Sequence, residues 1–302
     1  MKEFKDKVAV ITGGASGIGL GIAKRAVNEG MKVVIADIEE EALNSAEDIL
    51  KLLGDDVVSV VTDVSKVGDI EKLAQETIDN YGNVHLLCNN AGVGSAGVLW
   101  EASLAEWEWI MNVNLWGVIH GIRTFVPIML EQDEECHIVN TASLAGLIST
   151  NYEGIYSITK HGVVALSEVL SQELSAMKSK IKVSVLCPGF VKTNILNCIR
   201  NAPESVPDRD IDFDTALEEF IKVHPEAEEF LNMFMGMWES GITPDKAGDI
   251  VFEAIKDEAL YILTDTAILF KNMVKERMDG IFDAFKQNKA YARKRKTIEV
   301  AK

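Results

Sequence analysis

Tyr156 and Lys160, in the segment YSITK, are the two residues whose types and spacing point most directly to proton-transfer chemistry. Residues four positions apart on a helix lie on one face, so the phenol and the ammonium can point into one cleft. An ammonium about 4 Å from a phenol favours the phenolate by up to roughly 4 kcal/mol at an effective dielectric constant of about 20, although burial opposes this. We therefore predict a tyrosine pKa lowered by about one to three pH units, suited to general acid–base catalysis.

Ser143 is the residue expected to assist Tyr156. It follows the strand-like run HIVNTA (137–142), and its hydroxyl could hydrogen-bond a substrate oxygen and stabilise the charge that develops there. Each of these residues also has an ordinary structural interpretation. Tyr-x-x-x-Lys occurs by chance in many helices, Ser143 could form a turn or cap a helix, and Asn114 could cap or kink the helix that contains MNVNLWG.

A glycine-rich turn near the start of the chain indicates a phosphate-binding loop. Gly13, Gly17 and Gly19 lie between a predicted strand at 7–12 and a predicted helix at 17–29. Glycine allows the backbone to approach a phosphate, and the positive end of the helix holds the anion. A merely tight strand–helix turn is the alternative, but the position at the start of a βαβ unit favours dinucleotide binding.

Asp37 ends the second predicted strand, eighteen residues after Gly19. A carboxylate there can accept hydrogen bonds from the adenosine ribose hydroxyls and would repel a 2′-phosphate. Neither position 16, which is Ser16, nor position 38 offers a compensating cation. The sequence therefore favours NAD over NADP, although Asp37 could also be a surface residue before the helix at 39–53.

Short apolar runs alternate with helical patterns through the first two thirds of the chain. The predicted strands are 7–12, 32–37, 57–62, 84–89, 137–142, 182–187 and 259–264, and the predicted helices include 68–81, 104–130, 156–178 and 243–257. The strands are apolar on both faces, as in a parallel sheet covered by helices on each side. This rhythm predicts an α/β fold with a doubly wound, Rossmann-type sheet.

Two regions depart from this alternation. Residues 194–243 combine loop signals, such as those at 201–203 and 206–208, with the methionine-rich stretch EEFLNMFMGMWESG, which is either core or a mobile substrate lid. A further helix is expected at about 267–286, followed by a basic tail, Lys286–Lys296, that is most simply solvated. The apolar content of residues 190–238 predicts a lipophilic substrate, and its members are Phe190, Ile195, Leu196, Phe213, Phe220, Phe230, Met233, Phe234, Met237 and Trp238.

Together, the loop from Thr12 to Gly19, the NNAG segment at 89–92, Asn114, Ser143 and YSITK resemble the short-chain dehydrogenase/reductase family. The resemblance covers about residues 7–193, with a weaker match at 243–265. It implies one NAD-binding domain over residues 1–302, a parallel sheet of about seven strands, and a dimer or tetramer. The lid at 194–243 and the extension at 266–302 exceed the family's minimal form, which leaves the substrate open.

The resemblance also implies roles for individual residues. Asn114, Ser143, Tyr156 and Lys160 would form the catalytic group, with Asn114 positioning a water for proton relay and Lys160 also holding the nicotinamide ribose. Asp63 and Val64 would flank the adenine, and Asn90 and Ala91 the ribose. Residues bordering the nicotinamide would be Pro188, Gly189, Val191 and Thr193. Further cofactor contacts would come from Gly13, Ser16, Gly17, Ile18, Gly19, Asp37 and Gly92.

Composition argues against several other functions. The formal net charge of −17 disfavours nucleic acid as a partner. Four cysteines show no C-x-x-C spacing and five histidines no helical ligand pair, so no metal site is expected, and a reducing cytoplasm fits best. The start has no apolar run typical of a signal peptide, and the most apolar window, 113–130, is too short and polar for a membrane span.

The sequence thus predicts an NAD-dependent oxidoreductase that acts on a secondary alcohol or ketone, with Tyr156 as acid–base. Two alternatives stay open: an NADP-linked carbonyl reductase, and a non-catalytic NAD-binding sensor of the same fold. The sensor would bind dinucleotide without turnover, and it has no need for the full set of polar residues described above. Apolar residues on more than one face of the helices at 104–130 and 156–178 also favour a homo-oligomer.

Overall fold

The computed structural model describes residues 1–207 and 211–300, apart from the side chains of 290–300. The chain forms two compact units, Met1–Thr264 and Asp265–Lys302. Each is described by itself. The first unit contains the sheet and every site residue predicted above; the second contains the helix α10 (Ile268–Val300). Residues 208–210, the first of which belongs to the predicted loop at 206–208, and the last two residues of the chain lie outside the described parts.

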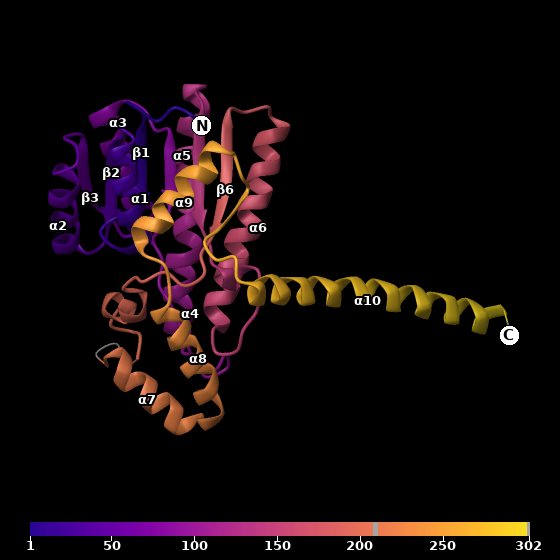
Figure 1. Ribbon diagram of the computed structural model, residues 1–302. Coiled ribbons are helices and arrows are strands. Elements are labelled where there is room, and N and C mark those ends of the chain that lie inside the picture. The colour runs from indigo at the N-terminus through magenta and orange to yellow at the C-terminus, as the bar shows by residue number, and fades with distance from the viewer. Residues whose placement is uncertain (208–210, 301–302) are drawn as a thin grey trace. The chain divides into compact units, whose positions relative to one another are not determined.

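The first unit is built on a parallel sheet whose order is β3-β2-β1-β4-β5-β6-β7, as Figure 1 shows for its labelled strands. Short β-branched runs form its strands: β1 (Val8–Thr12), β2 (Lys32–Asp37), β3 (Val57–Val61), β4 (Leu86–Asn89), β5 (Cys136–Thr141), β6 (Ile181–Cys187) and β7 (Tyr261–Leu263). The order reverses direction between β1 and β4. In doubly wound folds, ligands bind in the crevice beyond the carboxyl ends of the strands at such a point.

Helices cover both faces of the sheet, which confirms the doubly wound prediction. They are α1 (Gly17–Asn28), α2 (Glu40–Lys51), α3 (Val67–Tyr81), α4 (Leu104–Met111), α5 (Gly117–Gln132), α6 (Gly154–Ala176) and α9 (Pro244–Lys256). The helix predicted at 104–130 is interrupted: a π-helical turn, Asn112–Trp116, separates α4 from α5. Such turns are frequent at functional sites, and apolar periodicity alone does not reveal them.

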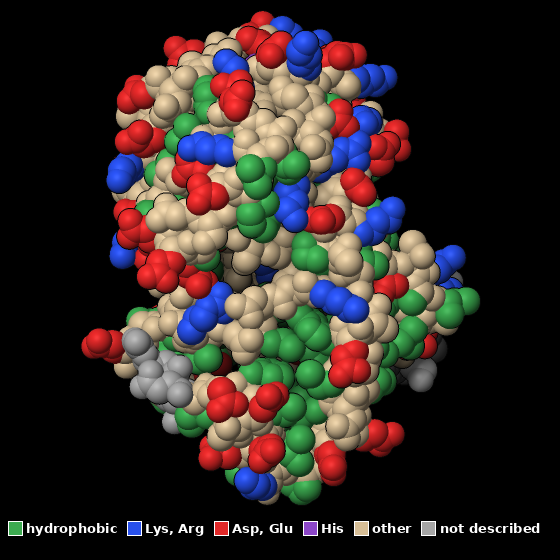
Figure 2. Space-filling view, turned by 60° about the vertical axis from the view of Figure 1, so that its left-hand side comes forward, with side chains coloured by type: hydrophobic (Ala, Val, Ile, Leu, Met, Phe, Trp, Pro, Cys, Tyr) green, Lys and Arg blue, Asp and Glu red, His purple; other side chains and the backbone are tan. Residues whose placement is uncertain are grey.

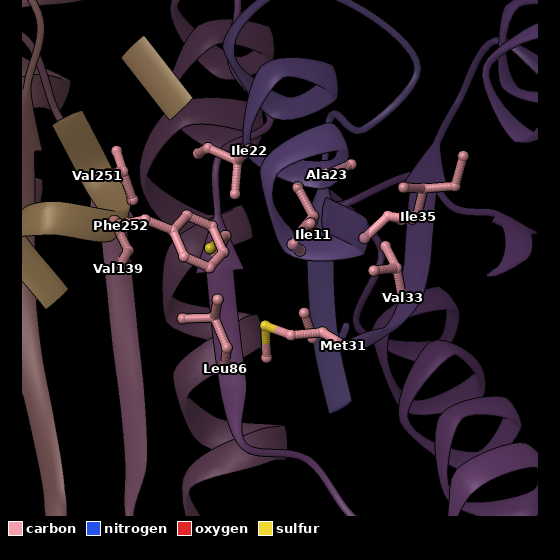
Figure 3. Packing of buried hydrophobic residues seen from close by; sticks show 14 of the residues in the cluster. Ile11, Ile22, Ala23, Met31, Val33, Ile35, Leu86, Val139, Val251 and Phe252 are labelled. Carbon is pink, nitrogen blue, oxygen red and sulfur yellow. The ribbon is translucent and has the colours of Figure 1, made fainter. Parts of the chain in front are cut away.

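Alternate residues of each strand enter different halves of the core. Ile11, Val33 and Leu86 point to the side of α1 and α9, where Figure 3 shows them packed with Ile22 and Phe252. Val10, Val34 and Leu87 belong to a second cluster, which includes Phe125 and Met129 of α5. Because both faces are dry, the strands read as continuous apolar runs in the sequence.

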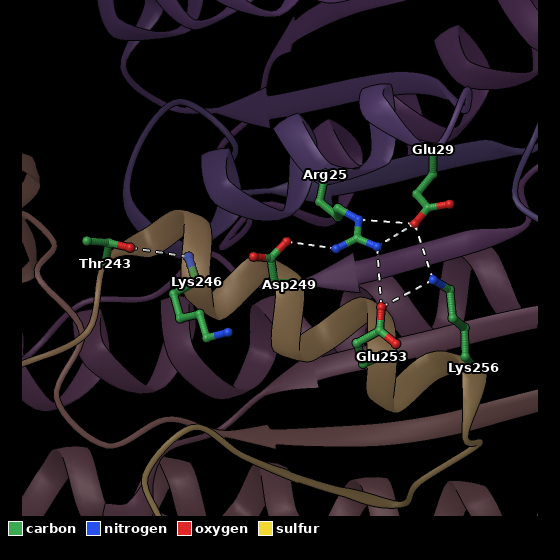
Figure 4. A network of polar contacts seen from close by, with 7 residues as sticks. All are labelled: Arg25, Glu29, Thr243, Lys246, Asp249, Glu253 and Lys256. Carbon is green, nitrogen blue, oxygen red and sulfur yellow. Dashed lines mark hydrogen bonds and ion pairs between the residues drawn. The ribbon is translucent and has the colours of Figure 1, made fainter.

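Close contact with α9 fixes the position of α1, whose N-terminus faces the cleft. A Cβ on Gly21 would lie 2.2 Å from the carbonyl oxygen of Pro244, so only glycine lets the two helices approach. Figure 4 shows the polar side of this contact, where Arg25 pairs with Glu29 and Asp249. Thr243 caps α9 by accepting the Lys246 N–H at 3.3 Å, as its sequence position before a proline predicts.

The predicted lid is helical for most of its described length. It contains the 3₁₀ segment Ile195–Asn201, α7 (Phe213–Val223), a 3₁₀ turn at Pro225–Ala227 and α8 (Glu228–Glu239). In the second unit, α10 continues to Val300 and does not end near residue 286. The basic residues of the predicted tail are therefore part of a helix, which is consistent with the high helix propensity of alanine, lysine and arginine.

One helical stretch among the described residues, Leu104–Gln132, is long and apolar enough by length and composition to cross a membrane. This is weak evidence, because the core helix of a water-soluble protein passes the same test. Phe125 and Met129 of this stretch are fully buried against the sheet. The apolar face that covers the core thus accounts for part of the hydropathy.

Candidate active site

A cleft of about 560 Å³ lies beyond the carboxyl ends of the strands. It is lined by every residue that the sequence assigned to the site except Gly19 and Asn114: Gly13, Ser16, Gly17, Ile18, Asp37, Asp63, Val64, Asn90, Ala91, Gly92, Ser143, Tyr156, Lys160, Pro188, Gly189, Val191 and Thr193. Figure 2 shows the molecule hollowed between the part built on the sheet and the part that holds α7 and α8. Hydrophobic side chains gather below this hollow.

The glycine loop has the backbone shape that a phosphate cradle requires. Gly13 and Gly17 have positive φ angles of 64° and 52°, a conformation that glycine adopts without strain. A Cβ on Gly19 would lie 2.0 Å from the Gly13 carbonyl oxygen, so this glycine supports the loop from beneath and does not line the cleft. Ser16 is the N-cap of α1 and its side chain makes no capping bond. The loop therefore fits a dinucleotide pyrophosphate.

Asn90 holds this loop in place. Its Nδ2 donates to the carbonyl oxygens of Thr12 and Gly13, at 3.1 and 3.3 Å, and its Oδ1 accepts the Thr141 hydroxyl. Ala91 N–H donates to the Thr12 hydroxyl oxygen. The end of β4 is thus tied to the end of β1, where the order of the sheet reverses.

Two carboxylates that the sequence assigned to the adenosine of a dinucleotide line the cleft, Asp37 at the end of β2 and Asp63 just beyond β3. Asp37 accepts the backbone N–H groups of Ala15 and Glu39, at 3.1 and 3.2 Å, and burial raises its pKa. Burial would also raise the pKa of Asp63, but hydrogen bonds from Ser65 and the nearby Lys66 lower it. Both side chains are already oriented by the backbone around them, so they can accept bonds from a ligand with little rearrangement.

Tyr156 lies in the first turn of α6, is half-buried and lines the cleft, with the Ser143 side chain beside its hydroxyl. Ser143 also caps a 3₁₀ turn by accepting the Ala145 N–H, which confirms its structural interpretation as a turn or cap residue. Burial raises the Tyr156 pKa, with the Ser143 bond acting in the opposite direction. The predicted lowering of this pKa is therefore wrong in this structure.

The position of Lys160 explains the discrepancy. Its ammonium donates to the Thr141 carbonyl oxygen at 3.0 Å and lies 5.5 Å from the centre of the Tyr156 ring. Its attraction for a phenolate is consequently weaker than the cost of dehydrating a buried phenol. Lys160 is 3% exposed, and burial lowers its own pKa to about 8.

Asn114 is fully buried in the π-helical turn and lies behind the cleft wall. Its carboxamide makes two bonds with the backbone of Val93, at 2.8 and 2.9 Å, and donates to the Thr159 hydroxyl at 3.3 Å. Thr159 precedes Lys160 on α6. A Cβ on Gly92 would lie 3.2 Å from Asn114 Oδ1 and 3.3 Å from Lys160 Nζ, so any larger residue would press against both groups.

The structure adds residues to the cleft that sequence reasoning missed. Glu39, Arg200 and Asn201 line it near Asp37, whereas Trp238, already named among the apolar lid residues, lines it from α8. Arg200 and Glu39 are 161 positions apart, and no spacing rule connects them. The only available signal was the apolar character of the lid region, which pointed to Trp238 but not to a cation.

Lys160 makes protein stability depend on pH. The unfolded lysine titrates near 10.4, whereas the folded one titrates at about 8. Between these values the unfolded state binds more protons, so stability should rise with pH. From about pH 7.5 to about pH 9.5, the wild type should gain about 2 kcal/mol relative to Lys160→Met, measured by urea unfolding. If the free energies of unfolding of the two proteins changed with pH in the same way, the lowered pKa of Lys160 in the folded protein would be refuted.

Comparison with known proteins identifies the class to which this fold and cleft belong. The family described as short chain dehydrogenase matches residues 7–204. A CLA biosynthesis dehydrogenase/reductase of Lactiplantibacillus plantarum is 34% identical over 281 residues, which cover 93% of this chain and 95% of that protein. A C alpha-dehydrogenase of a Sphingobium species is 35% identical over 264 residues, 87% and 82% of the two chains.

A solved structure gives the same result. A short chain dehydrogenase/reductase from Burkholderia phymatum, crystallised in complex with NAD, superimposes with a TM-score of 0.84 at 41% identity. The match covers 93% of this chain and 96% of that one. The chain belongs to the short-chain dehydrogenase family, a family of oxidoreductases.

Proposed function

We propose that this protein is an NAD-dependent oxidoreductase that interconverts a secondary alcohol and a ketone, with Tyr156 as the general acid and base. The observation that carries the proposal is the placement of the Ser143 side chain beside the Tyr156 hydroxyl in the cleft that the glycine loop borders. NAD would supply the hydride acceptor. The residues of the chain would bind and orient the substrate and move its hydroxyl proton.

Each catalytic residue would then have a distinct task. Tyr156 would exchange a proton with the substrate oxygen, and Ser143 would donate a hydrogen bond to the same oxygen as negative charge develops on it. Because burial raises its pKa, Tyr156 rests as the protonated phenol, the form that protonates a ketone oxygen. Asn114 would position Lys160 through Thr159 and the Val93 backbone.

The preference for NAD is inferred from Asp37. Its carboxylate lines the adenosine end of the cleft and would accept bonds from ribose hydroxyls, whereas a 2′-phosphate would meet a negative charge. The relative from Burkholderia phymatum binds NAD in its crystal structure. We expect Asp37→Ala to weaken NAD binding and to narrow the ratio of NAD to NADP affinities by at least about tenfold.

One observation favours the second candidate, an NADP-linked reductase. Arg200 lines the cleft near Asp37, and guanidinium is the usual partner of a phosphate. Glu39 occupies the Nε–Nη2 edge of this guanidinium and Nη1 donates to the Asn197 carbonyl oxygen, which leaves the arginine less available to a ligand. Direct measurement of NAD and NADP affinities separates the two candidates.

A lipophilic substrate is inferred from the aromatic side chains of α8. Phe234 lies 5.1 Å, centroid to centroid, from Phe190, and Trp238 lies 6.4 Å from the same ring. Phe230 contacts Tyr152 at 5.7 Å, just before α6. These rings form an aromatic cluster that joins α8 to the segment after β6 and to the segment before α6. Trp238 of this cluster lines the cleft, where its ring would contact an apolar molecule.

The test is a panel of secondary alcohols of increasing apolar size, each mixed with NAD and followed by NADH absorbance. The proposal expects kcat/KM to rise with apolar size and to be at least about tenfold higher with NAD than with NADP. Binding of NAD without turnover of any alcohol or ketone would favour the sensor instead.

We also infer a homo-oligomer in a reducing compartment such as the cytoplasm. The π-helical turn and α5 leave Trp116 45% exposed, and all four cysteines are free thiols. Sedimentation equilibrium should find dimers or tetramers at micromolar concentration; monomers alone would reject this part of the proposal.

A further inference from the structure

The segment Ile195–Val206, here called the strap, leaves the nicotinamide side of the cleft and runs to its adenosine side. It begins just after Thr193, whose side chain lies about 3.0 Å from where a Cβ of Gly17 would be. Ile195, Cys198, Arg200, Asn201, Pro203 and Ser205 of the strap all line the cleft. The strap therefore borders the space that a dinucleotide would occupy along much of its length.

Packing anchors the strap along one edge. Ala202 and Val206 are buried in a cluster with Trp109 and Ile110 of α4. The Gly94 N–H also contacts Cys198 Sγ at 3.2 Å. These contacts join the strap to α4 and to the loop that follows β4, both of which belong to the wall of the cleft.

A polar clasp anchors the opposite side. Arg200 Nε and Nη2 donate to the two carboxylate oxygens of Glu39, the residue that precedes α2, and Asn201 Nδ2 donates to the same carboxylate at 2.8 Å. Arg200 Nη1 donates to the Asn197 carbonyl oxygen at 2.6 Å, which fixes the arginine in its own turn. Glu39 is tied in turn to Asp37, whose Oδ1 accepts the Glu39 N–H.

We propose that Glu39 and Arg200 are positioning residues that clasp the strap across the adenosine side of the cleft and so limit how fast dinucleotide enters and leaves. The inference rests on the proposed NAD function. A dinucleotide in the cleft would have the strap beside it, joined on one side by apolar packing and on the other by the clasp. Opening the clasp is the smaller change, because it exposes no apolar core and breaks only bonds that water can replace.

The exposure of the clasp makes its behaviour measurable. Side chains of Arg200 and Glu39 are 36% and 31% exposed, so the ion pair is weak and screened by salt. Its loss should therefore change rates by roughly two- to fivefold without unfolding the protein. Salt should accelerate dinucleotide release in the wild type and have little effect once the clasp has been removed.

The experiment compares Glu39→Gln, Arg200→Gln and the double variant, with Lys180→Gln as a control that removes an exposed ion pair, Lys180–Asp133, outside the cleft. NADH release is followed by stopped-flow fluorescence, and hydrogen exchange of residues 195–206 is measured without added dinucleotide. Both single variants should release NADH roughly two- to fivefold faster and exchange faster in the strap. The double variant should have the same NADH release rate and the same strap exchange rate as the single variants, because either change alone opens the clasp.

Three results would overturn the clasp. The first is an NADH release rate in the variants equal to that of the wild type. The second is a double variant in which the effects of the two substitutions on the release rate add, since additivity means that each residue contacts the dinucleotide separately. The third is unchanged hydrogen exchange in the strap. If the wild type failed to bind NADH at all, the proposed function would fail, and the exchange measurement would still test the clasp.

Discussion

Tyr156→Phe should reduce kcat by at least about a hundredfold, because positioned acid–base groups contribute about 10²–10⁴-fold to rates. The change removes one oxygen, the atom that would exchange a proton with substrate, and leaves the buried ring in place. NAD affinity should change by less than about threefold, since the hydroxyl's assigned partner is Ser143 and not the glycine loop. Steady-state rates and NADH-binding fluorescence measure the two quantities separately.

Tyr152→Phe is the matched control. This tyrosine lies four residues earlier and contacts Phe220 and Phe230 through its ring, contacts that phenylalanine retains. Its kcat should stay within about twofold of the wild type. Turnover that survives Tyr156→Phe within about tenfold would refute the assigned acid–base, and a parallel loss of NAD binding would show a structural role instead.

The pH dependence of the wild type should agree with this assignment. Because burial raises the Tyr156 pKa, the phenol is protonated at neutral pH, and alcohol oxidation requires it to lose that proton. Oxidation should therefore accelerate as pH rises, while ketone reduction should not, and Tyr156→Phe should flatten the oxidation profile.

The fold followed from the sequence because its causes are local. Runs such as VAVIT and KVVIAD, apolar on both faces and separated by helical patterns, specify a buried parallel sheet. Strand ends differ from the prediction by only a few residues, as at β4, which begins at Leu86 and not at residue 84. The π-helical turn at Asn112–Trp116 was missed because one inserted residue hardly disturbs the apolar pattern on either side.

The cleft followed from motif spacing, whereas its electrostatics did not. Residue types and spacing placed Tyr156 and Lys160 on one helix face, and the structure brings both to the cleft. Whether attraction or dehydration dominates the tyrosine pKa depends on where the lysine ammonium points, and it points to the Thr141 carbonyl oxygen. That orientation depends on β5 lying against α6, a tertiary contact that no local pattern specifies.

The clasp between Glu39 and Arg200 is another contact that local sequence patterns do not specify. The sequence search for a cation near Asp37 considered positions 16 and 38, which are close to the glycine loop and to Asp37 along the chain. The structure supplies one from position 200, carried there by the strap. A long insertion can bring a charge to a site from any distance in the sequence. A prediction of NAD or NADP preference that uses only residues close to Asp37 in sequence therefore overlooks the charges that the lid supplies.

Gly19→Ala should abolish NAD binding, with at least about a hundredfold loss of affinity, although alanine is the better helix former by about 1 kcal/mol. The new methyl group would lie 2.0 Å from the Gly13 carbonyl oxygen and 2.6 Å from Asn90 Nδ2. Neither atom can retreat freely, because Asn90 Nδ2 holds the carbonyl oxygens of Thr12 and Gly13. The phosphate loop must therefore shift, and overpacking of this kind costs about 1–3 kcal/mol of stability.

Gly68→Ala is the control that separates this clash from a general effect of replacing glycine in a helix. Gly68 is the second residue of α3, and a Cβ there would meet nothing within 4 Å. Its stability should be unchanged or higher by up to about 1 kcal/mol, with NAD affinity as in the wild type. If Gly19→Ala bound NADH as tightly as Gly68→Ala in fluorescence titrations, the loop could not be the rigid phosphate cradle that its geometry indicates, and the cofactor assignment would lose its structural basis.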